Sequence, residues 1–468
     1  MGEFAGRSGS VPVVAIVGGG ASGTLTAAHL LLRGRGPGVS PRVILIDQYG
    51  RHGLGQAYAT TDSHHLLNVC ATRMSALEGD PDHLLRWVRA QGQDVTGADY
   101  IPRRLYGRYL RAVLAEARRA WPAGHLTQLT GTVTSLREPG QGRPIRLTLS
   151  DGGRLDADAV VLATGNRPPA ALRGVPAGPR CVPDPWVPDA LTGICDGSPV
   201  LVAGTGLTMV DIAITVTRTH PGSVVFAVSR HGLLPRTHRP LPPPPADVRL
   251  PAHVQNLAGL MRALRVAVKD NGGEWQGVVD ALRPHVPRLW GGLSTEDKRR
   301  FLDLVARYWE IHRHRIPPAT ASRIAHLRAT GRLRVLRGRV GSAVADRDGV
   351  TVAIDAEAGT RELRVGWLVN GTGPASDVAG VPFLDELFTN GTARPDPLRL
   401  GLDADAAGAV LDAAGRPHER IFTLGPTLRG LRYETTAIPE IRAQAAALAS
   451  RLDRMLTPGN RWPDTSVA

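Results

Sequence analysis

Three glycines near the N-terminus, Gly18, Gly20 and Gly23, have the Gly-x-Gly-x-x-Gly spacing that can hold the pyrophosphate of a dinucleotide. In such a loop the first glycine permits a tight turn and the second lets the backbone approach the phosphates. The third lets a helix lie close to a strand. The spacing alone is weak evidence because the chain contains 54 glycines. The neighbouring residues therefore decide what the motif means.

The elements around these glycines form a complete βαβ pattern. Residues 13–17 are apolar and β-branched and predict a buried parallel strand, an Ala- and Leu-rich helix follows to about residue 33, and a second strand covers 42–47. Asp47 ends that strand, where a carboxylate can accept hydrogen bonds from the hydroxyls of an adenosine ribose. Because strand, helix and acid are all present, the sequence predicts a nucleotide site.

A second glycine pair, Gly204 and Gly206, repeats this pattern near the middle of the chain, with Thr208 opening the helix that follows. The next strand ends in Ser229 and Arg230 instead of an acid. An arginine at this point suits the 2′-phosphate of NADPH, so we expect these five residues to form an NADPH site. The alternative is a structural βαβ unit with an incidental surface arginine.

The order of these elements indicates how the chain is divided. Two further hydrophobic strands, at 157–163 and 365–370, each end in a Thr-Gly turn, which is common where a chain leaves or re-enters a nucleotide domain. We predict an α/β fold with two Rossmann-like dinucleotide-binding domains and a small helical subdomain. The expected ranges are 1–170 with 366–468 for the first domain, 197–250 with 330–365 for the second, and 251–329 for a helical substrate subdomain.

The formal net charge of the 468-residue chain is +14, and it comes almost wholly from arginine. Such a charge is compatible with nucleic acid, a membrane surface or small anionic ligands, or with a solvated arginine-rich surface. No RNP-type aromatic motif, zinc knuckle or polybasic block accompanies the charge, so we do not expect a nucleic-acid partner. No signal peptide or membrane span is visible and the three cysteines form no Cys-x-x-Cys, so we expect a cytoplasmic protein without a metal site.

Several blocks of the sequence resemble the FAD- and NAD(P)-binding proteins of the YdhS-like group, which is related to the flavin-dependent N-hydroxylating monooxygenases. The chemistry characterised in this group is the oxidation of L-aspartate, through N-hydroxyaspartate, to nitrosuccinate. The blocks that carry the resemblance are 53–77, 80–88, 100–110, 200–211, 229–238, 308–318 and 424–445.

The resemblance implies that FAD occupies the first site and NADPH the second. Gly18, Gly20, Gly23 and Asp47 would hold the adenosine and pyrophosphate of FAD. Asn68 is the flavin-adjacent candidate for catalysis, and no other catalytic residue is assigned. The further residues expected at the FAD are Gln56, Tyr58, Asn68, Met74, Thr164, Gly165, Gly425, Pro426 and Thr436. Gln56 and Met74 could instead hold their loop together.

Two clusters of basic side chains are candidates for binding a substrate with two carboxylates. Arg236 and His238 follow the strand of the second site, and Arg313, His314 and Arg315 end an amphipathic helix. The guanidinium group of arginine binds a carboxylate through two hydrogen bonds. The alternative assigns some of these residues to the phosphates of NADPH and others to the carboxyl end of the helix.

The cofactors limit the reaction. Once NADPH has transferred its hydride to FAD, the reduced flavin needs an electron acceptor. The sequence has no Cys-x-x-Cys, iron–sulfur or haem motif, so O2 is the remaining acceptor. We therefore predict a monooxygenase that N-hydroxylates a small anionic amino acid, with L-aspartate leading, through a flavin C4a-hydroperoxide. The alternatives are another NADPH-dependent flavin oxidoreductase and a non-catalytic FAD/NADPH-binding redox sensor. The oligomeric state is open, and a homo-oligomer is one option.

Overall fold

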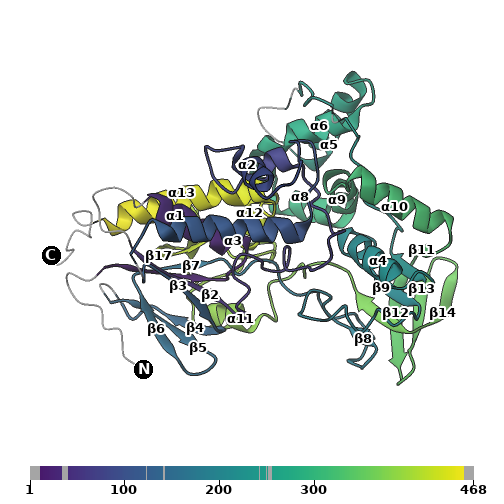
Figure 1. Ribbon diagram of the computed structural model, residues 1–468, viewed down its shortest axis with the longest axis horizontal. Coiled ribbons are helices and arrows are strands. Elements are labelled where there is room, and N and C mark those ends of the chain that lie inside the picture. Colours follow the sequence, from purple (N-terminus) through teal and green to yellow (C-terminus); the bar gives the residue numbers. More distant parts are fainter. Residues whose placement is uncertain are drawn as a thin grey trace. The chain divides into compact units, whose positions relative to one another are not determined.

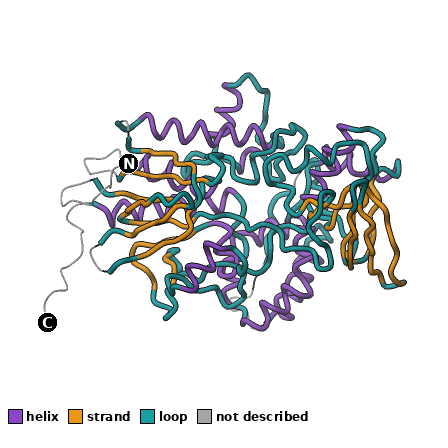
Figure 2. Tube along the Cα trace, turned by 90° about the horizontal axis from the view of Figure 1, so that it is seen from below, coloured by secondary structure: helices purple, strands orange, loops and turns teal. Residues whose placement is uncertain are grey.

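The computed structural model describes residues 11–457 except 34–40, 123, 141–142, 242, 249 and 251–255. The chain forms two compact units, each built around its own parallel sheet. The strands, orange in Figure 2, gather into one group within each unit. The first unit comprises the residues up to Thr60, Cys70–Asn166 and those from Asp377 onward, and the second comprises Thr61–Val69 and Arg167–Ser376.

The first unit contains a six-stranded sheet. Its strands are, in spatial order, β16 (Ala409–Leu411), β17 (Pro417–Thr423), β7 (Ala159–Leu162), β1 (Val13–Val17), β2 (Arg42–Asp47) and β3 (Leu126–Thr130). β16 runs antiparallel to β17, and the other neighbours are parallel. Because β1 lies between β2 and β7 and is covered on both faces, its sequence is an unbroken apolar run.

Different layers cover the two faces of this sheet. The helices α1 (Ala21–Arg33), α3 (Arg103–Arg119) and α13 (Ile438–Leu456) lie together along one face (Figure 1). The other face carries a small antiparallel sheet, β4 (Val133–Arg137), β5 (Ile145–Leu149) and β6 (Arg154–Ala157), together with α11 (Pro382–Thr389). Ala15 and Val17 of β1 join the core on that second face. The unit also contains α2 (His83–Ala90) and α12 (Arg429–Arg432).

The second unit repeats this order of layers. Its five parallel strands are, in spatial order, β11 (Leu333–Arg337), β10 (Val225–Ser229), β9 (Val200–Ala203), β15 (Trp367–Asn370) and β8 (Cys181–Val182). One face packs against α4 (Leu207–Thr219) and α10 (Pro318–Ala329). The other packs against an antiparallel sheet of β12 (Arg339–Ala345), β13 (Val350–Ala356) and β14 (Gly359–Val365). In both units the antiparallel sheet leads directly into a strand of the parallel sheet.

A helical part lies between β10 and β11 in the sequence. It contains α5 (Leu257–Asp270), α6 (Trp275–Leu282), α7 (Val286–Gly292), α8 (Thr295–Arg300) and α9 (Ala306–Arg313), with a π-helical turn at Phe301–Val305 joining α8 to α9. Val278, Leu282 and Leu289 form its small core. The predicted fold class, α/β with two parallel-sheet units and a small helical part, is confirmed. Among the described helices, none has the length and apolar character needed to cross a bilayer.

The glycines after β1 allow three segments of backbone to meet. Gly18 has a φ of 113°, and a Cβ on it would overlap the carbonyl oxygen of Ala163, the residue after β7. A Cβ on Gly23, in the first turn of α1, would overlap the carbonyl oxygen of Gly18. The first and third glycines are therefore required by packing, since both neighbouring atoms belong to the backbone and cannot rotate away.

We predict that Gly23→Ala lowers the free energy of unfolding by about 3 kcal/mol, because the added methyl group forces α1 away from β1. Bound FAD per chain should fall as well. Gly222→Ala is the matched control, because Gly222 is exposed and a Cβ there would have no neighbour within 4 Å. Chemical denaturation and the flavin absorbance of the purified variants measure both quantities. Equal stability of the two variants would show that the packing argument is wrong.

Candidate functional site

The N-terminus of α1 is where the structure brings several of the predicted FAD residues together. A Cβ on Gly20 would have one neighbour, the Cα of Gly55 at 3.4 Å, so the backbone at Gly20 can be approached closely. Gly425 has a φ of 74° and packs against the hydroxyl of Ser22 in the first turn of α1. Thr164 follows directly on the strand end that contacts Gly18. The glycine loop, the end of β7 and the C-terminal segment at Gly425 thus meet at the N-terminus of α1.

The Asp47 carboxylate is fixed by its own loop. Its Oδ1 accepts hydrogen bonds from the backbone N–H groups of Tyr49, at 3.0 Å, and Arg51, at 2.8 Å. Its Oδ2 accepts none from the described residues, and it lies 3.0 Å from where a Cβ on Gly19 would be. This second oxygen is therefore oriented and available for the hydroxyls of a ribose.

The remaining predicted FAD residues of the first unit differ in their surroundings. The Tyr58 ring packs 4.8 Å from the ring of Tyr106, and burial raises the pKa of Tyr58, so its phenol stays protonated. Met74 is buried, and its carbonyl accepts the Tyr106 hydroxyl at 2.9 Å. Gln56 and Thr436 are exposed, whereas Gly165 and Pro426 are partly buried. The role of these residues in binding FAD stays a prediction.

The glycine loop of the second unit has nearly the same geometry as the first. Gly204 has a φ of 122°, and a Cβ on it would overlap the carbonyl oxygen of Gly371, the residue after β15. No atom lies within 4 Å of a Cβ built on Gly206, the residue that precedes α4. Thr208, in the first turn of α4, forms no hydrogen bond to a described residue. An open backbone and a free hydroxyl thus lie at a helix N-terminus, which suits a phosphate.

Ser229 and Arg230 follow β10 and have different tasks. The Ser229 hydroxyl is 2.9 Å from the Thr205 hydroxyl and accepts the Gly232 N–H at 3.1 Å, so it shapes the turn. The Arg230 side chain is exposed and forms no ion pair with a described carboxylate.

A basic patch that the sequence did not reveal surrounds His231. It consists of Arg230 after β10, Arg337 at the end of β11, Arg339 at the start of β12 and Arg307 in α9. Desolvation and then the charges of these four arginines lower the pKa of His231. β10 and β11 are adjacent, and Ser229 pairs with Arg337, so the patch lies at the carboxyl edge of the sheet, where such folds bind ligands.

The two clusters predicted to bind substrate come together in the second unit. The Arg236 N–H donates to the carbonyl of Ile311 at 2.9 Å, and the His238 N–H donates to the carbonyl of Ile316 at 3.0 Å. The Arg236 side chain is exposed and makes no hydrogen bond or ion pair to a described residue. It is thus held beside the end of α9 with its guanidinium group available.

The other candidates in these clusters already have partners. Arg315 is 3% exposed, forms an ion pair with Asp280 and donates to Gln276 at 3.0 Å. The His238 Nε2 lies 3.0 Å from the carbonyl oxygen of Asn68, which can only accept, so Nε2 carries the proton. Burial and the charge of Arg315 lower the pKa of His238 to about 4, so it is neutral at pH 7. His314 pairs with Glu310 at 2.9 Å, and Arg313 is buried.

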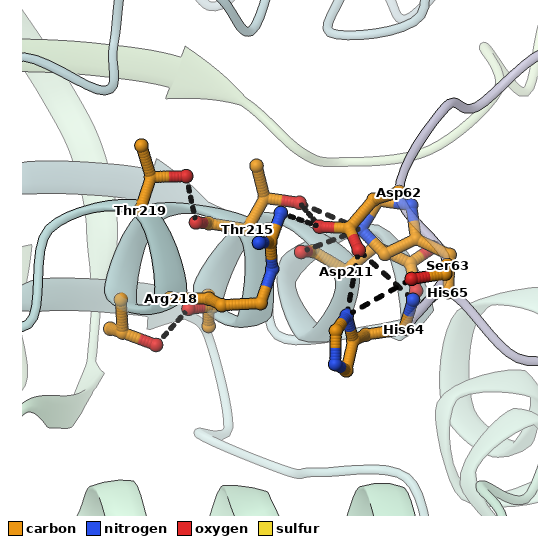
Figure 3. Close-up of polar contacts among 10 residues, drawn as sticks. Asp62, Ser63, His64, His65, Asp211, Thr215, Arg218 and Thr219 are labelled. Carbon is orange, nitrogen blue, oxygen red and sulfur yellow. Dashed lines mark hydrogen bonds and ion pairs between the residues drawn. The ribbon is translucent and has the colours of Figure 1, made fainter.

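A short segment that we call the strap, Thr61–Val69, belongs to the second unit although its sequence neighbours belong to the first. The buried Asp62 fixes the strap to α4 (Figure 3). Its Oδ2 accepts hydrogen bonds from the Thr215 hydroxyl at 2.9 Å and from Arg218 at 3.1 Å, and its Oδ1 accepts the His64 N–H at 2.9 Å. Burial opposes ionisation, but the hydrogen bonds from His64 and Thr215 outweigh it and hold the pKa of Asp62 well below its usual range.

A buried histidine extends this network. The His65 Nε2 lies 3.1 Å from the carbonyl oxygen of Asp211 and 2.8 Å from the Thr215 hydroxyl. Thr215 already donates its hydrogen to Asp62, so it accepts from His65, and Nε2 carries the proton. The direction of donation therefore runs from His65 through Thr215 to Asp62. Nothing in the spacing of these residues indicated that the strap docks on α4.

We predict that Asp62→Asn weakens strap docking by about 2 kcal/mol at pH 7, because Arg218 and Thr215 lose their charged acceptor. The depressed pKa stabilises the folded state above the pKa of a free aspartate, near 4. The difference between wild type and variant should therefore shrink as the pH falls below about 4. Hydrogen exchange of residues 61–69 measures the docking directly. Asp94→Asn, an exposed position, is the control, and equal exchange in both variants would refute the assignment.

Comparison with known proteins agrees with this geometry. Residues 15–167 match a family model described as FAD-NAD(P)-binding. Over 171 residues the chain is 35% identical to L-aspartate N-monooxygenase (nitrosuccinate-forming) of Streptomyces cremeus. That match covers 34% of this chain and 24% of the relative, so the chain spans about a quarter of the length of this curated relative.

Solved structures share the fold over nearly the whole chain. L-lysine 6-monooxygenase from Pseudomonas syringae has a TM-score of 0.66 at 18% identity, covering 95% of this chain and 99% of that one. The ornithine N-hydroxylase of Kutzneria sp. 744, solved with reduced FAD, NADP+ and L-ornithine, has a TM-score of 0.62 at 17% identity and the same coverage. Residues 15–167 are therefore similar to FAD-NAD(P)-binding domains, and the chain shares the fold of these two solved structures over nearly its whole length.

Proposed function

We propose that this chain is an NADPH- and FAD-dependent monooxygenase that hydroxylates the amine nitrogen of a small anionic amino acid. L-aspartate, converted to N-hydroxyaspartate and on to nitrosuccinate, is the leading candidate. The observation that carries the proposal is the paired geometry of the two glycine loops. In each unit a glycine with positive φ touches the backbone of a neighbouring strand end, beside an accessible helix N-terminus.

The first loop fits FAD. The backbone at Gly18 and Gly20 and the N-terminus of α1 would hold the pyrophosphate, and Oδ2 of Asp47 would accept the ribose hydroxyls. FAD, when bound, supplies the redox chemistry, since it takes up the hydride of NADPH and passes electrons to O2. The protein has to position the reactants and exclude water.

Three hydrogen bonds among Gly425, Thr435 and Gln444 fix the C-terminal loop beside the first glycine loop. The Gly425 N–H donates to the side-chain oxygen of Gln444 at 2.8 Å, and the Thr435 hydroxyl donates to the carbonyl of Gly425 at 3.0 Å. The Gln444 amide in turn donates to the Thr435 hydroxyl at 2.8 Å. This closed triangle fixes Gly425 and Pro426 against the first turn of α1, as a segment that covers a flavin requires.

The second loop fits NADPH, with Gly206 and Thr208 at the pyrophosphate and Arg230 at the 2′-phosphate. Arg337 and Arg339 add to the positive charge there. For the amino acid, Arg236 is the candidate for binding a carboxylate, because Arg315 is engaged by Asp280. The neutral His238 orients Asn68 by donating to its carbonyl. A substrate with fixed negative charge suits this environment, whereas a cationic side chain does not.

We predict that Arg230→Ala raises the KM for NADPH about tenfold, because the charge-assisted hydrogen bonds to the 2′-phosphate are lost. The KM for NADH should change little. Initial rates of flavin reduction with each coenzyme measure the effect. Arg328→Ala, an exposed arginine on α10, is the control. An equal rise for both coenzymes would remove Arg230 from the phosphate site.

We predict that L-aspartate accelerates NADPH consumption in air and yields N-oxidised products, while the amount of hydrogen peroxide formed per NADPH falls. L-glutamate, L-ornithine, L-lysine and cadaverine are tested in parallel, with NADPH absorbance, peroxide and hydroxylamine measured together. Arg236→Ala should raise the KM for the accepted acidic amino acid and leave flavin reduction by NADPH unchanged.

The other outcomes of this assay separate the alternatives. Turnover of L-ornithine, L-lysine or cadaverine would keep N-hydroxylation and overturn the anionic substrate class. Formation of peroxide alone, whatever the amine, would overturn N-hydroxylation and favour an oxidase. A bound flavin that NADPH never reduces would favour the non-catalytic sensor.

A further inference from the structure

We propose that Arg307 and Tyr308, at the start of α9, belong to the NADPH site and bind the 2′-phosphoadenosine end of the coenzyme. The inference rests on the proposed function and deepens it. The βαβ pattern assigns the choice between NADPH and NADH to the residues after β10. The inference adds residues of α9, a helix of the helical part, to that choice. Tyr308 would stack on the adenine, and Arg307 would pair with the 2′-phosphate.

Tyr308 is placed as an exposed aromatic wall beside the basic patch. Its ring centroid lies 6.3 Å from that of His231, with the ring planes 30° apart, and the residue is 46% exposed. The next residue, Trp309, packs against the core of the helical part, which holds the helix in place. Leu304, one turn earlier, is 59% exposed. An aromatic ring held in this way presents a flat surface on which a base can stack.

Arg307 brings a charge without a compensating acid. Its Nη1 donates to the carbonyl of Asp303 at 2.5 Å, and its guanidinium carbon lies 5.0 Å from the Tyr308 ring centroid. Its Nε is buried and makes no hydrogen bond to a described residue. After desolvation, its charge is the largest influence on the neighbouring His231.

The patch as a whole lacks a partner of opposite sign. None of Arg230, Arg307, Arg337 and Arg339 forms an ion pair with a carboxylate of the described residues. Gathering four like charges around one imidazole is unfavourable unless an anion joins them. A phosphate monoester, with nearly two negative charges and three acceptor oxygens, is the complement that such a group of guanidinium forks would bind.

The position of α9 gives this arrangement a second consequence. A π-helical turn, Phe301–Val305, directly precedes α9, and such turns occur frequently at functional sites. α9 begins at Ala306, has Arg307 and Tyr308 in its first turn, and ends at Arg313. The same helix therefore carries the two residues proposed for the coenzyme and, through the Ile311 carbonyl, positions the backbone of Arg236, the candidate for the amino acid.

The test measures binding of two probes to the FAD-loaded full chain by titration calorimetry. Adenosine 2′,5′-bisphosphate carries the 2′-phosphate, and adenosine 5′-monophosphate does not. Wild type should prefer the bisphosphate. Arg307→Ala should weaken binding of the bisphosphate about tenfold and leave the monophosphate unchanged. Tyr308→Ala should weaken binding of both about tenfold, and Tyr308→Phe should restore it. Arg328→Ala is the control, and thermal unfolding verifies that each variant is folded.

The outcomes distinguish the inference from the proposed function. If Arg230→Ala abolishes the preference for the bisphosphate while Arg307→Ala and Tyr308→Ala bind both probes like wild type, the inference is overturned and the NADPH site stands. If wild type shows no preference for the bisphosphate, the NADPH site falls and the inference falls with it. Loss of preference in Arg307→Ala together with rescue by Tyr308→Phe supports the inference.

Discussion

The contact between a glycine loop and the strand end beside it is the constraint on which both units depend. In each unit, a backbone carbonyl after one strand meets the first glycine after its neighbour, Ala163 against Gly18 and Gly371 against Gly204. Neither contact leaves room for a side chain. The close approach lets the chain turn from the strand into the helix that follows, with the helix N-terminus beside the neighbouring strand end. The conformation of each glycine loop is therefore fixed by packing.

The same constraint explains why the two units look alike although their sequences differ. Each has helices on one face of a parallel sheet, an antiparallel sheet on the other, and a strand after that sheet whose end contacts the glycine loop. The differences lie where specificity is needed. The second strand of the first unit ends in a carboxylate held by its own loop, whereas that of the second unit is followed by Arg230, beside arginines from other elements.

The sequence was informative where a local pattern carries the structural requirement. The glycine spacing and the apolar strands predicted two nucleotide-binding units. The acid or arginine at the end of the second strand predicted which unit takes FAD and which takes NADPH. It was uninformative where a site is assembled from distant segments. Arg307, Arg337 and Arg339 reach His231 from three elements whose adjacency depends on strand order. Arg315, predicted from the sequence to bind substrate, forms an ion pair with the partly buried Asp280, which the sequence pattern did not indicate. The docking of Asp62 on α4 depends on a tertiary contact with no periodic signature.

The interleaving of the two units in the sequence also affects how the protein is made. The polypeptide passes from one unit to the other at residues 60–61, 69–70, 166–167 and 376–377. On the ribosome, the whole second unit emerges before β17 and α13, which complete the first. The edge of β7 that β17 will occupy must therefore wait, unpaired, while more than two hundred residues are added. Domains usually fold as units in the order of synthesis, but here the unit begun first is finished last. Exposed strand edges favour mispairing, so aggregation during expression should begin at the unpaired edge of β7.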